Sequence, residues 1–276
     1  MKKGFQTKVI SPAGTSFERK SIDRLSAINL RERPQQRIPF QFSWDESMEA
    51  NTGIATLYNI KNKDLEGFKH KKELKLHVGW LPYGKNEQLV IKGTILDITT
   101  YPIENRKTMS SDIKFRDTPL KYHEGFVSRK WGKGTPATQV FKDIVEDEIG
   151  TQIEYFQPKR EPQYRRGKSF YCPIIHALRQ VVNDLKSKMF FYNKKAYLLP
   201  TPKTVPPTQQ IENKDLIKGV PSKTKGEKQI TTLFNSKLKP ATKVSLASEG
   251  AFRVYSGKHY STEGKKLRTD LIGSLK

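Results

Sequence analysis

The sequence predicts a mainly β fold with an α+β middle. Short runs of alternating apolar and polar residues fill 37–117 and return from 229, and two segments with helical spacing lie between them. A proline-rich stretch at 200–207 marks a natural boundary. We therefore expect three regions, at 1–125, 126–200 and 201–276.

The first region is expected to hold short strands separated by turns. In the first of them Ile38, Phe40, Phe42 and Trp44 alternate with polar residues or proline, the pattern of a strand with one buried face. Because no helical pattern intervenes, the strands are predicted to form an antiparallel sheet that closes into a small barrel or sandwich. The other runs are 53–58, 73–80, 89–99 and 109–115.

The middle region has the pattern of two amphipathic helices and a hairpin. Thr135 suits the N-cap of the first helix, Pro136 its first helical position and Gly150 its end. The runs 189–192 and 196–199 flank Asn193-Lys194-Lys195, which predicts a β-hairpin with a tight turn. The expected buried faces are Val140, Phe141, Ile144, Val145 and Ile149, and, after Pro173, Ile174, Ile175, Leu178, Val181, Val182, Leu185 and Met189.

The last region is expected to start with an extended connector and to continue as strands. The prolines of 200–207 exclude a helix or a central strand there. The two ends of the chain are thus alike in style, although we find no exact internal sequence repeat. The β-type runs are 229–235, 243–247, 251–260 and 267–272.

Composition limits the classes of protein. With 276 residues, 35% hydrophobic residues and a mean hydropathy of −0.70, the chain can bury a core and is rich in polar loops. Lys and Arg number 51 against 28 Asp and Glu, a net charge of +23 that is spread in small groups. This charge fits a nucleic acid and a large acidic protein partner equally well.

Cys172 is the only cysteine, which excludes an intramolecular disulfide and implies a reducing compartment. The first ten residues lack the apolar core of a signal peptide, and nowhere do 18 apolar residues run together. We therefore expect a soluble protein that has no membrane partner and is not exported by a classical signal.

No cofactor or metal is predicted, because the candidate motifs fail on spacing. Trp131-Gly132-Lys133-Gly134-Thr135 is similar to a phosphate-binding loop, but Val127 stands where that motif needs its first glycine. It is predicted to be a loop leading into the N-cap. No two histidines stand four apart, so we expect surface or locally hydrogen-bonded roles for His70, His77, His123, His176 and His259, with His176 on the polar side of the second helix.

No catalytic residue is predicted either, and the residues that bind a partner are not evident. Glu146, Asp147 and Glu148 follow one another on a helix, so they are expected to point in different directions at a solvated helix end. Packing or capping is the expected role of Cys172. The groups 190–195 and 164–166 combine aromatic and basic residues that could bind bases and phosphates, but a core strand with a polar turn fits Phe190, Phe191, Tyr192, Lys194 and Lys195 better.

The order of these segments resembles the hub protein family of phage tails and contractile injection systems, which includes the late control protein D and the N-terminal region of tail-associated proteins. The similarity covers almost the whole chain and lies in the number and order of its pieces. Ser236 and Ala241 depart from the family's usual proline and glycine at one turn. The pieces are 40–60, 74–79, 92–98, Ser128, Trp131, Gly134, Thr135, Phe141, Val145, 166–200, 216–220, 233–235, 238–240 and 252–254.

This resemblance implies two small tube-like β-barrel domains joined by a helical, α+β segment. It also implies a homotrimer whose barrels imitate the sixfold tail tube, acting as a non-enzymatic symmetry adaptor at a virion's tail tip or baseplate during host cell entry, after assembly in the host cytoplasm. Its partners would be a tail tube or distal tail protein on one side and a spike, a fibre, another tail-tip protein or the end of a tape-measure protein on the other. DNA would only pass through the lumen.

Two alternatives stay open on the sequence. A basic nucleic-acid-binding protein would lose affinity steeply with salt, whereas a hub would make salt-tolerant protein contacts. Some tail-tip proteins carry a cell-wall hydrolase. Because we expect no extension after the last strands, we expect such an activity in another chain.

Overall fold

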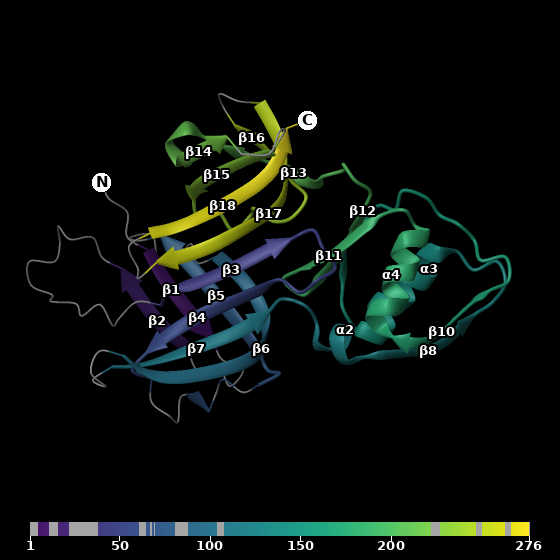
Figure 1. Cartoon of the computed structure of the whole chain (residues 1–276), viewed down its shortest axis with the longest axis horizontal. Coiled ribbons are helices and arrows are strands. Elements are labelled where there is room, and N and C mark those ends of the chain that lie inside the picture. Colours follow the sequence, from purple (N-terminus) through teal and green to yellow (C-terminus); the bar gives the residue numbers. More distant parts are fainter. Residues whose placement is uncertain are drawn as a thin grey trace, which may run out of the picture.

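The computed structural model shows a large twisted β assembly with an α/β lobe at one side (Figure 1). It describes residues 5–10, 16–21, 38–60, 65–66, 68, 70–80, 88–103, 108–221, 227–246, 250–262 and 266–275. Their strands form sheets of 13, 3 and 2 strands. The predicted mainly β class with an α+β middle is therefore confirmed. No helix in this part of the chain is long and apolar enough to cross a membrane.

The strands of the first region form where the alternation predicts them. Along β3 the side chains of Phe40, Phe42 and Trp44 are buried, as expected. The strands pair in the order β3-β4-β7-β6-β5, and two strands that were not predicted, β1 and β2, extend the sheet beyond β5. The elements are β1 (Phe5–Ile10), β2 (Ser16–Ser21), β3 (Phe40–Asp45), β4 (Thr52–Tyr58), β5 (Glu73–Trp80), β6 (Gln88–Ile103) and β7 (Thr108–Arg116).

The last region contributes the strands β14-β15-β18-β17-β16, in that order, to the same sheet. The prediction of a plain connector over 200–207 was wrong from Val205 onward, because β13 starts there and pairs parallel with β16. Its register shifts between Val205 and Gln209, so the ladder passes over Pro206 and Pro207, which have no N–H to donate. The elements are β13 (Val205–Ile211), η4 (Asn213–Asp215), β14 (Leu216–Pro221), β15 (Glu227–Leu233), β16 (Thr242–Leu246), β17 (Gly250–Thr262) and β18 (Lys266–Leu275).

The middle region contains the predicted helices and hairpin. The first helix begins after Pro136, which takes the N-cap position predicted for Thr135; the Thr135 hydroxyl instead donates to the Gly132 carbonyl. Gly150 ends this helix in a left-handed conformation, as predicted. The helix α2 (Leu120–Glu124) lies just before this region, and its Tyr122 packs in the same core. The elements of the region are β8 (Phe126–Trp131), α3 (Ala137–Lys142), the π-helix η3 (Asp143–Ile149), β9 (Ile153–Phe156), β10 (Lys168–Pro173), α4 (Ile174–Asp184), β11 (Lys188–Tyr192) and β12 (Lys195–Leu199). The sequence did not predict α2, β8, β9 or β10.

The buried hydrophobic residues form two cores. One belongs to the middle region and joins α3, η3 and α4 to the inner face of the β8–β10 ribbon. The other is shared by the first and last regions, so that Phe42 of β3, Ile113 of β7 and Leu271 of β18 lie in one cluster. The β11–β12 hairpin contributes to both: Phe190 lies in the shared core and Phe191 in the core of the middle region. The hairpin therefore anchors the lobe to the β assembly.

The first and last regions meet where β17 pairs antiparallel with β3, a contact that we call the seam. Residues 256–261 of β17 lie opposite residues 40–45 of β3. Gly257 faces Trp44, and a Cβ atom on Gly257 would lie only 2.4 Å from the indole ring. Next to the seam the buried side chains of Glu46 and Arg253 form an ion pair of 2.5 Å, and Arg253 Nε donates to the Lys203 carbonyl at 2.8 Å. The seam thus combines a strand ladder, a close apolar contact and a buried charge pair.

Burial raises the pKa of Glu46, and the neighbouring Arg253 guanidinium opposes that shift. A charge in this position needs its partner, because an unpaired buried charge is strongly destabilising. The pair therefore links the end of β3 to β17 and to the segment before β13.

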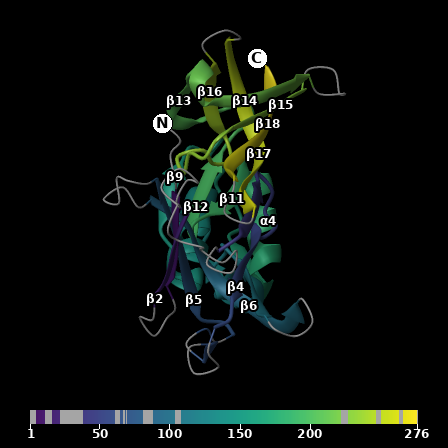
Figure 2. The same cartoon turned by 90° about the vertical axis from the view of Figure 1, so that its left-hand side faces the viewer.

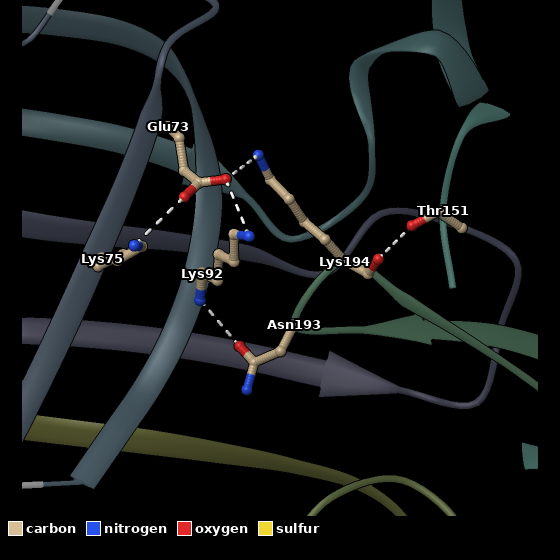
Figure 3. A network of polar contacts seen from close by, with 6 residues as sticks. All are labelled: Glu73, Lys75, Lys92, Thr151, Asn193 and Lys194. Atoms are coloured by element: carbon tan, nitrogen blue, oxygen red, sulfur yellow. Dashed lines mark hydrogen bonds and ion pairs between the residues drawn. The ribbon is translucent and has the colours of Figure 1, made fainter. Parts of the chain in front are cut away.

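Polar contacts attach the lobe to the first region. Glu73 on β5 forms ion pairs with Lys194 of the hairpin turn and with Lys92 of β6, each at 3.3 Å (Figure 3). The backbone N–H of Lys92 donates to Asn193 Oδ1 at 2.8 Å, and the Thr151 hydroxyl bonds the Lys194 carbonyl. The predicted tight turn is what brings these groups together, because Asn193 and Lys194 have positive φ values of 53° and 61°.

A buried carboxyl group completes this junction. Asp117 is fully buried, and its Oδ2 accepts a hydrogen bond of 2.9 Å from Asn51, whose amide also donates to the Phe191 carbonyl. Burial raises the pKa of Asp117 to about 8. At neutral pH the folded protein therefore holds this carboxyl group mainly in its protonated form.

Replacement of Gly257 by alanine is expected to destabilise the seam by about 1 to 3 kcal/mol, because the added methyl group would overlap the Trp44 ring. Gly132→Ala is the matched control, since a Cβ atom at Gly132 meets no atom within 4 Å. Chemical denaturation of both variants measures the difference. Equal stability losses would contradict the packing described for the seam.

Stability should fall between about pH 4 and pH 8 through Asp117. The unfolded chain releases this proton near 3.8, whereas the folded protein retains it up to about 8, so the folded state binds the extra proton in this window. Asp117→Asn cannot ionise and keeps an acceptor for Asn51. Thermal unfolding should show this variant to be more stable than the wild type at pH 8, by roughly 1 to 3 kcal/mol, with a smaller difference at pH 5. The exposed Asp97→Asn is the control, and a pH-independent difference for Asp117→Asn would contradict the assignment.

Candidate assembly surface

The two β regions repeat one arrangement of strands. Each unit has five strands, which lie in the sheet in the order first, second, fifth, fourth, third when they are numbered along the chain. This order is β3-β4-β7-β6-β5 in one unit and β14-β15-β18-β17-β16 in the other. Each unit therefore consists of a hairpin, a single strand and a second hairpin. Figure 1 shows the unit that ends in β18 above the unit that ends in β7. This repeat is not visible in the sequence.

The outward face of each unit carries the same polar cluster. Asp112 of β7 accepts hydrogen bonds from Thr56 of β4 at 2.7 Å and from Tyr101 of β6 at 3.0 Å. In the other unit, Asp270 of β18 accepts from Thr231 of β15 at 2.8 Å and from Tyr260 of β17 at 3.4 Å. Each threonine lies directly opposite its aspartate in the strand register.

Tyr101 and Tyr260 complete the match. They lie opposite Ser110 and Arg268, each two residues before the aspartate, so all three members of the cluster occupy equivalent positions in the two units.

Two further features match around these clusters. The ladder between β6 and β7 shifts register between Ile95 and Asp97, and that between β17 and β18 shifts between Val254 and Ser256. In each case the bulge lies five residues before the tyrosine. On the inner face, Thr100 bonds Ser111 at 3.0 Å in one unit and His259 bonds Thr269 at 2.9 Å in the other. The two units are therefore built on one plan down to single side chains.

The two units differ at one strand edge. After its bulge, β17 pairs with β3 across the seam. The equivalent half of β6, from Asp97 to Ile103, pairs only with β7 among the described residues, and the residues 99–102 are exposed. His259 is fully buried, whereas its counterpart Thr100 is open to solvent. Burial lowers the pKa of His259 to about 4, so this imidazole is neutral at pH 7.

The structure places the candidate loop and the histidines as follows. Lys133 is exposed in the loop before α3, and Gly134 has a left-handed φ of 85°. His123 bonds Thr118 at 2.8 Å, and His176 lies on the exposed side of α4, as predicted. His259 is a core residue that bonds the Leu238 carbonyl as well as Thr269. Within the described residues no group of three His, Cys, Asp or Glu side chains is placed to hold a metal ion.

The acidic triplet behaves differently from its prediction. Asp147 and Glu148 both approach the guanidinium of Arg129, at 2.8 and 3.8 Å, and Asp143 joins them at 3.0 Å. The expectation of different directions was therefore wrong for Asp147 and Glu148, whereas Glu146 and Asp147 are exposed, as expected for a solvated helix end. The π-helix η3 carries Asp143, Asp147 and Glu148, and β8 brings Arg129 to them.

The aromatic and basic groups make contacts within the chain, and the hairpin is a core strand followed by a polar turn, as predicted. Phe190 stacks on Tyr197 with ring centroids 5.0 Å apart, and Lys195 pairs with Glu154 at 2.7 Å. The Tyr164 hydroxyl donates to Asp184 at 2.7 Å. Cys172 is half-buried and packs against the core of the middle region, which agrees with the predicted packing role.

Two sets of surface residues were not evident from the sequence. The first is the pair of Asp-Thr-Tyr clusters, for which the one signal is a tyrosine 11 or 10 residues before an aspartate. The second is an aromatic pair on the outer face of the β8–β10 ribbon, where Phe126 and Tyr171 meet edge to face at 4.8 Å and Tyr171 is 82% exposed. If β8 and β10 had been predicted, the alternation of inward and outward side chains along them would have placed both aromatic residues on the outer face.

The sequence matches no family model, and no curated protein matches it. Solved structures do match. A tail protein from Neisseria meningitidis MC58 superimposes with a TM-score of 0.67 at 8% identity, covering 99% of this chain and 97% of that chain. The 43 kDa tail protein of prophage MuSo2 from Shewanella oneidensis gives 0.63 at 9% identity, over 97% and 98% of the two chains.

A third similar structure comes from a secretion system. The c3393 protein of E. coli, a component of the type VI secretion system with structural similarity to the T4 bacteriophage tail proteins gp27 and gp5, gives a TM-score of 0.61 at 6% identity, over 87% of this chain and 73% of that chain. These similarities extend over both β units and the lobe between them. The chain therefore has the fold of phage tail proteins and of baseplate hub-like proteins of the type VI secretion system.

Proposed function

We propose that this chain is a structural, non-enzymatic subunit of a phage-type tail tip or baseplate. Three copies would form a ring that joins a sixfold tail tube to a threefold spike or fibre. The internal repeat carries this proposal: two β units of the same plan in each chain give six similar units in a trimer. The similarity to tail proteins supports the same setting.

The repeat suits a symmetry adaptor for a geometric reason. A sixfold partner needs six similar contacts, and the shared plan of the two units, with equivalent clusters at Asp112 and Asp270, supplies two per chain. The lobe between the units occurs once per chain, so a trimer would present it three times. One face of the ring can thus match a sixfold partner while the lobes meet a threefold one.

The proposed partners follow from this arrangement. A tail tube or distal tail protein would contact the ring formed by the β units, and a spike, fibre, tape-measure end or other tail-tip protein would contact the threefold side. The exposed pair of Phe126 and Tyr171 gives the lobe an apolar patch of the kind found in protein contacts. DNA would pass only through the lumen, and the net charge of +23 would face either that path or an acidic partner.

The chain would be assembled in the host cytoplasm and reside in the virion. We propose that 1–125, 126–200 and 201–276 are its three functional regions.

A structural role also explains the polar residues. Of the carboxylates that the sequence offered as acids, Asp147 and Glu148 are held by Arg129 on the lobe. The carboxylates of Asp112 and Asp270 in the β units are held by threonine and tyrosine hydroxyls in two equivalent places. A catalytic site would need one set of such groups in one cleft, whereas a repeated set stabilises a repeated fold.

Light scattering on protein freed of nucleic acid should give a mass near three times 31.8 kDa. Because the contacts between β units are expected to be hydrogen-bonded and apolar, this mass should persist from low to high salt. Averaged electron micrographs of the particle should then show six similar densities around a threefold axis. A closed ring of any other copy number would contradict the proposal.

Binding to DNA separates the hub from the nucleic-acid alternative. A hub should bind a DNA duplex only weakly at physiological salt and remain a trimer with or without it. A protein that stays monomeric and binds DNA tightly, with affinity falling by orders of magnitude between about 50 and 200 mM salt, would favour the alternative. Titration of labelled duplex at several salt concentrations, alongside light scattering, measures both properties.

A further inference from the structure

We infer that the second half of β6 and the outer edge of β14 are the two sides of one contact between copies of this chain. In this contact, β6 of one copy pairs antiparallel with β14 of the next, as β17 pairs with β3 within the chain. The inference rests on the ring proposed above and adds the atoms that would close it.

The fourth strands of the two units, β6 and β17, differ in the neighbours of their second halves. The first half of β17 pairs with β16, and its second half, after the bulge, pairs with β3. The first half of β6 pairs likewise with β5, but among the described residues its second half has a neighbour only on the β7 side. Thr99, Thr100, Tyr101 and Pro102 are all exposed there. One unit thus has a covered edge where the other has an open one.

The strand equivalent to the partner of β17 is β14. Within its unit β3 is the first strand and pairs with β4; its counterpart in the other unit is β14, which pairs with β15. β14 is the last strand of the sheet at that end, so its other edge is open within the described part of the chain. β14, the counterpart of β3, therefore has an open edge that could pair with β6, but it lies on the far side of the molecule from β6.

The two open edges lie far apart within one chain. Figures 1 and 2 show β14 and β6 at opposite ends of the β assembly, so the two edges of one chain cannot meet each other. A head-to-tail contact between copies is the remaining way to join them. Such contacts form closed rings when the rotation between copies closes, which fits a trimer.

The equivalence also fixes the register. Across the seam Tyr260 lies opposite Gln41. The counterpart of Tyr260 is Tyr101. The counterpart of Gln41 is Val220, because Gln41 pairs with the residue two before Thr56 and Val220 with the residue two before Thr231. Tyr101 of one copy should therefore lie opposite Val220 of the next.

Two prolines limit this contact to a short ladder. Pro102 on β6 and Pro221 on β14 stand where β17 and β3 have Ser261 and Phe42, and neither proline has an N–H to donate. Proline on an exposed edge is a known way to prevent open-ended strand pairing. The contact would thus hold a defined neighbour in a ring and disfavour a growing sheet.

Paired cysteines test the register. In a Cys172→Ser background, Tyr101→Cys with Val220→Cys places the two Cα atoms about 4.5 to 5.5 Å apart across the contact, within disulfide range. The matched control, Tyr101→Cys with Lys218→Cys, is out of register by two residues and leaves about 7 to 8 Å between the cysteines. After mild oxidation, non-reducing electrophoresis should show covalent trimers for the first pair at several times the yield of the second.

A second pair of variants tests the edge without new bonds. Thr100→Pro removes an N–H from the open edge, whereas Thr100→Val removes only the hydroxyl that bonds Ser111. Light scattering should show dissociation to monomers for Thr100→Pro at concentrations where Thr100→Val stays trimeric, with circular dichroism confirming that both are folded.

The outcomes separate this inference from the proposed function. A wild-type trimer in which neither cysteine pair cross-links, or in which the shifted pair cross-links better, overturns the inference and leaves the trimeric hub intact. A trimer that survives Thr100→Pro also overturns it. A wild-type protein that stays monomeric throughout overturns both.

Discussion

The antiparallel pairing of β17 with β3 is the contact on which the rest of the structure depends. It joins strands that are more than 200 residues apart in the chain into one ladder, and thereby places both hydrophobic faces over a single core. Gly257 allows the Trp44 ring to lie against the ladder, and the ion pair of Glu46 with Arg253 closes its end next to the start of β13. Without this pairing each unit would expose both an apolar face and a strand edge.

The repeat explains why equivalent positions hold different residues. Thr100 and His259 occupy the same place, yet one is exposed and the other is fully buried, because only β17 is covered by a neighbouring strand. The His259 imidazole can be buried beneath the neighbouring strand because it is neutral at pH 7 and forms hydrogen bonds with Thr269 and the Leu238 carbonyl. The clusters at Asp112 and Asp270 face outward in both units and keep the same three residue types. Burial thus decides which parts of the common plan diverge.

The lobe is attached by a polar junction in addition to its apolar core. The hairpin turn brings Lys194 to Glu73 and Asn193 to the backbone of β6, while the protonated Asp117 links Asn51 to the base of the hairpin. Hydrogen bonds of this kind have strict geometry, so they fix the direction in which the lobe projects from the β units. A fixed direction is what the proposed threefold arrangement of lobes would require.

The local pattern of the sequence determined the strands from β3 to β7, the two main helices and the β11–β12 hairpin, because period and turn chemistry act over a few neighbouring residues. It also showed the strand character of the last region and, through the order of the pieces, the similarity to tail hub proteins. Local pattern could not show that Val205 starts a strand, because that depends on β16, or that Asp147 and Glu148 share Arg129. Nor could it show the repeat, since the equivalent residues, such as Thr56 and Thr231, are matched by register and not by sequence. Only the tertiary structure decided which strand lies beside which, because strand partners are chosen by hydrogen-bonded edges and a shared core that form between distant parts of the chain.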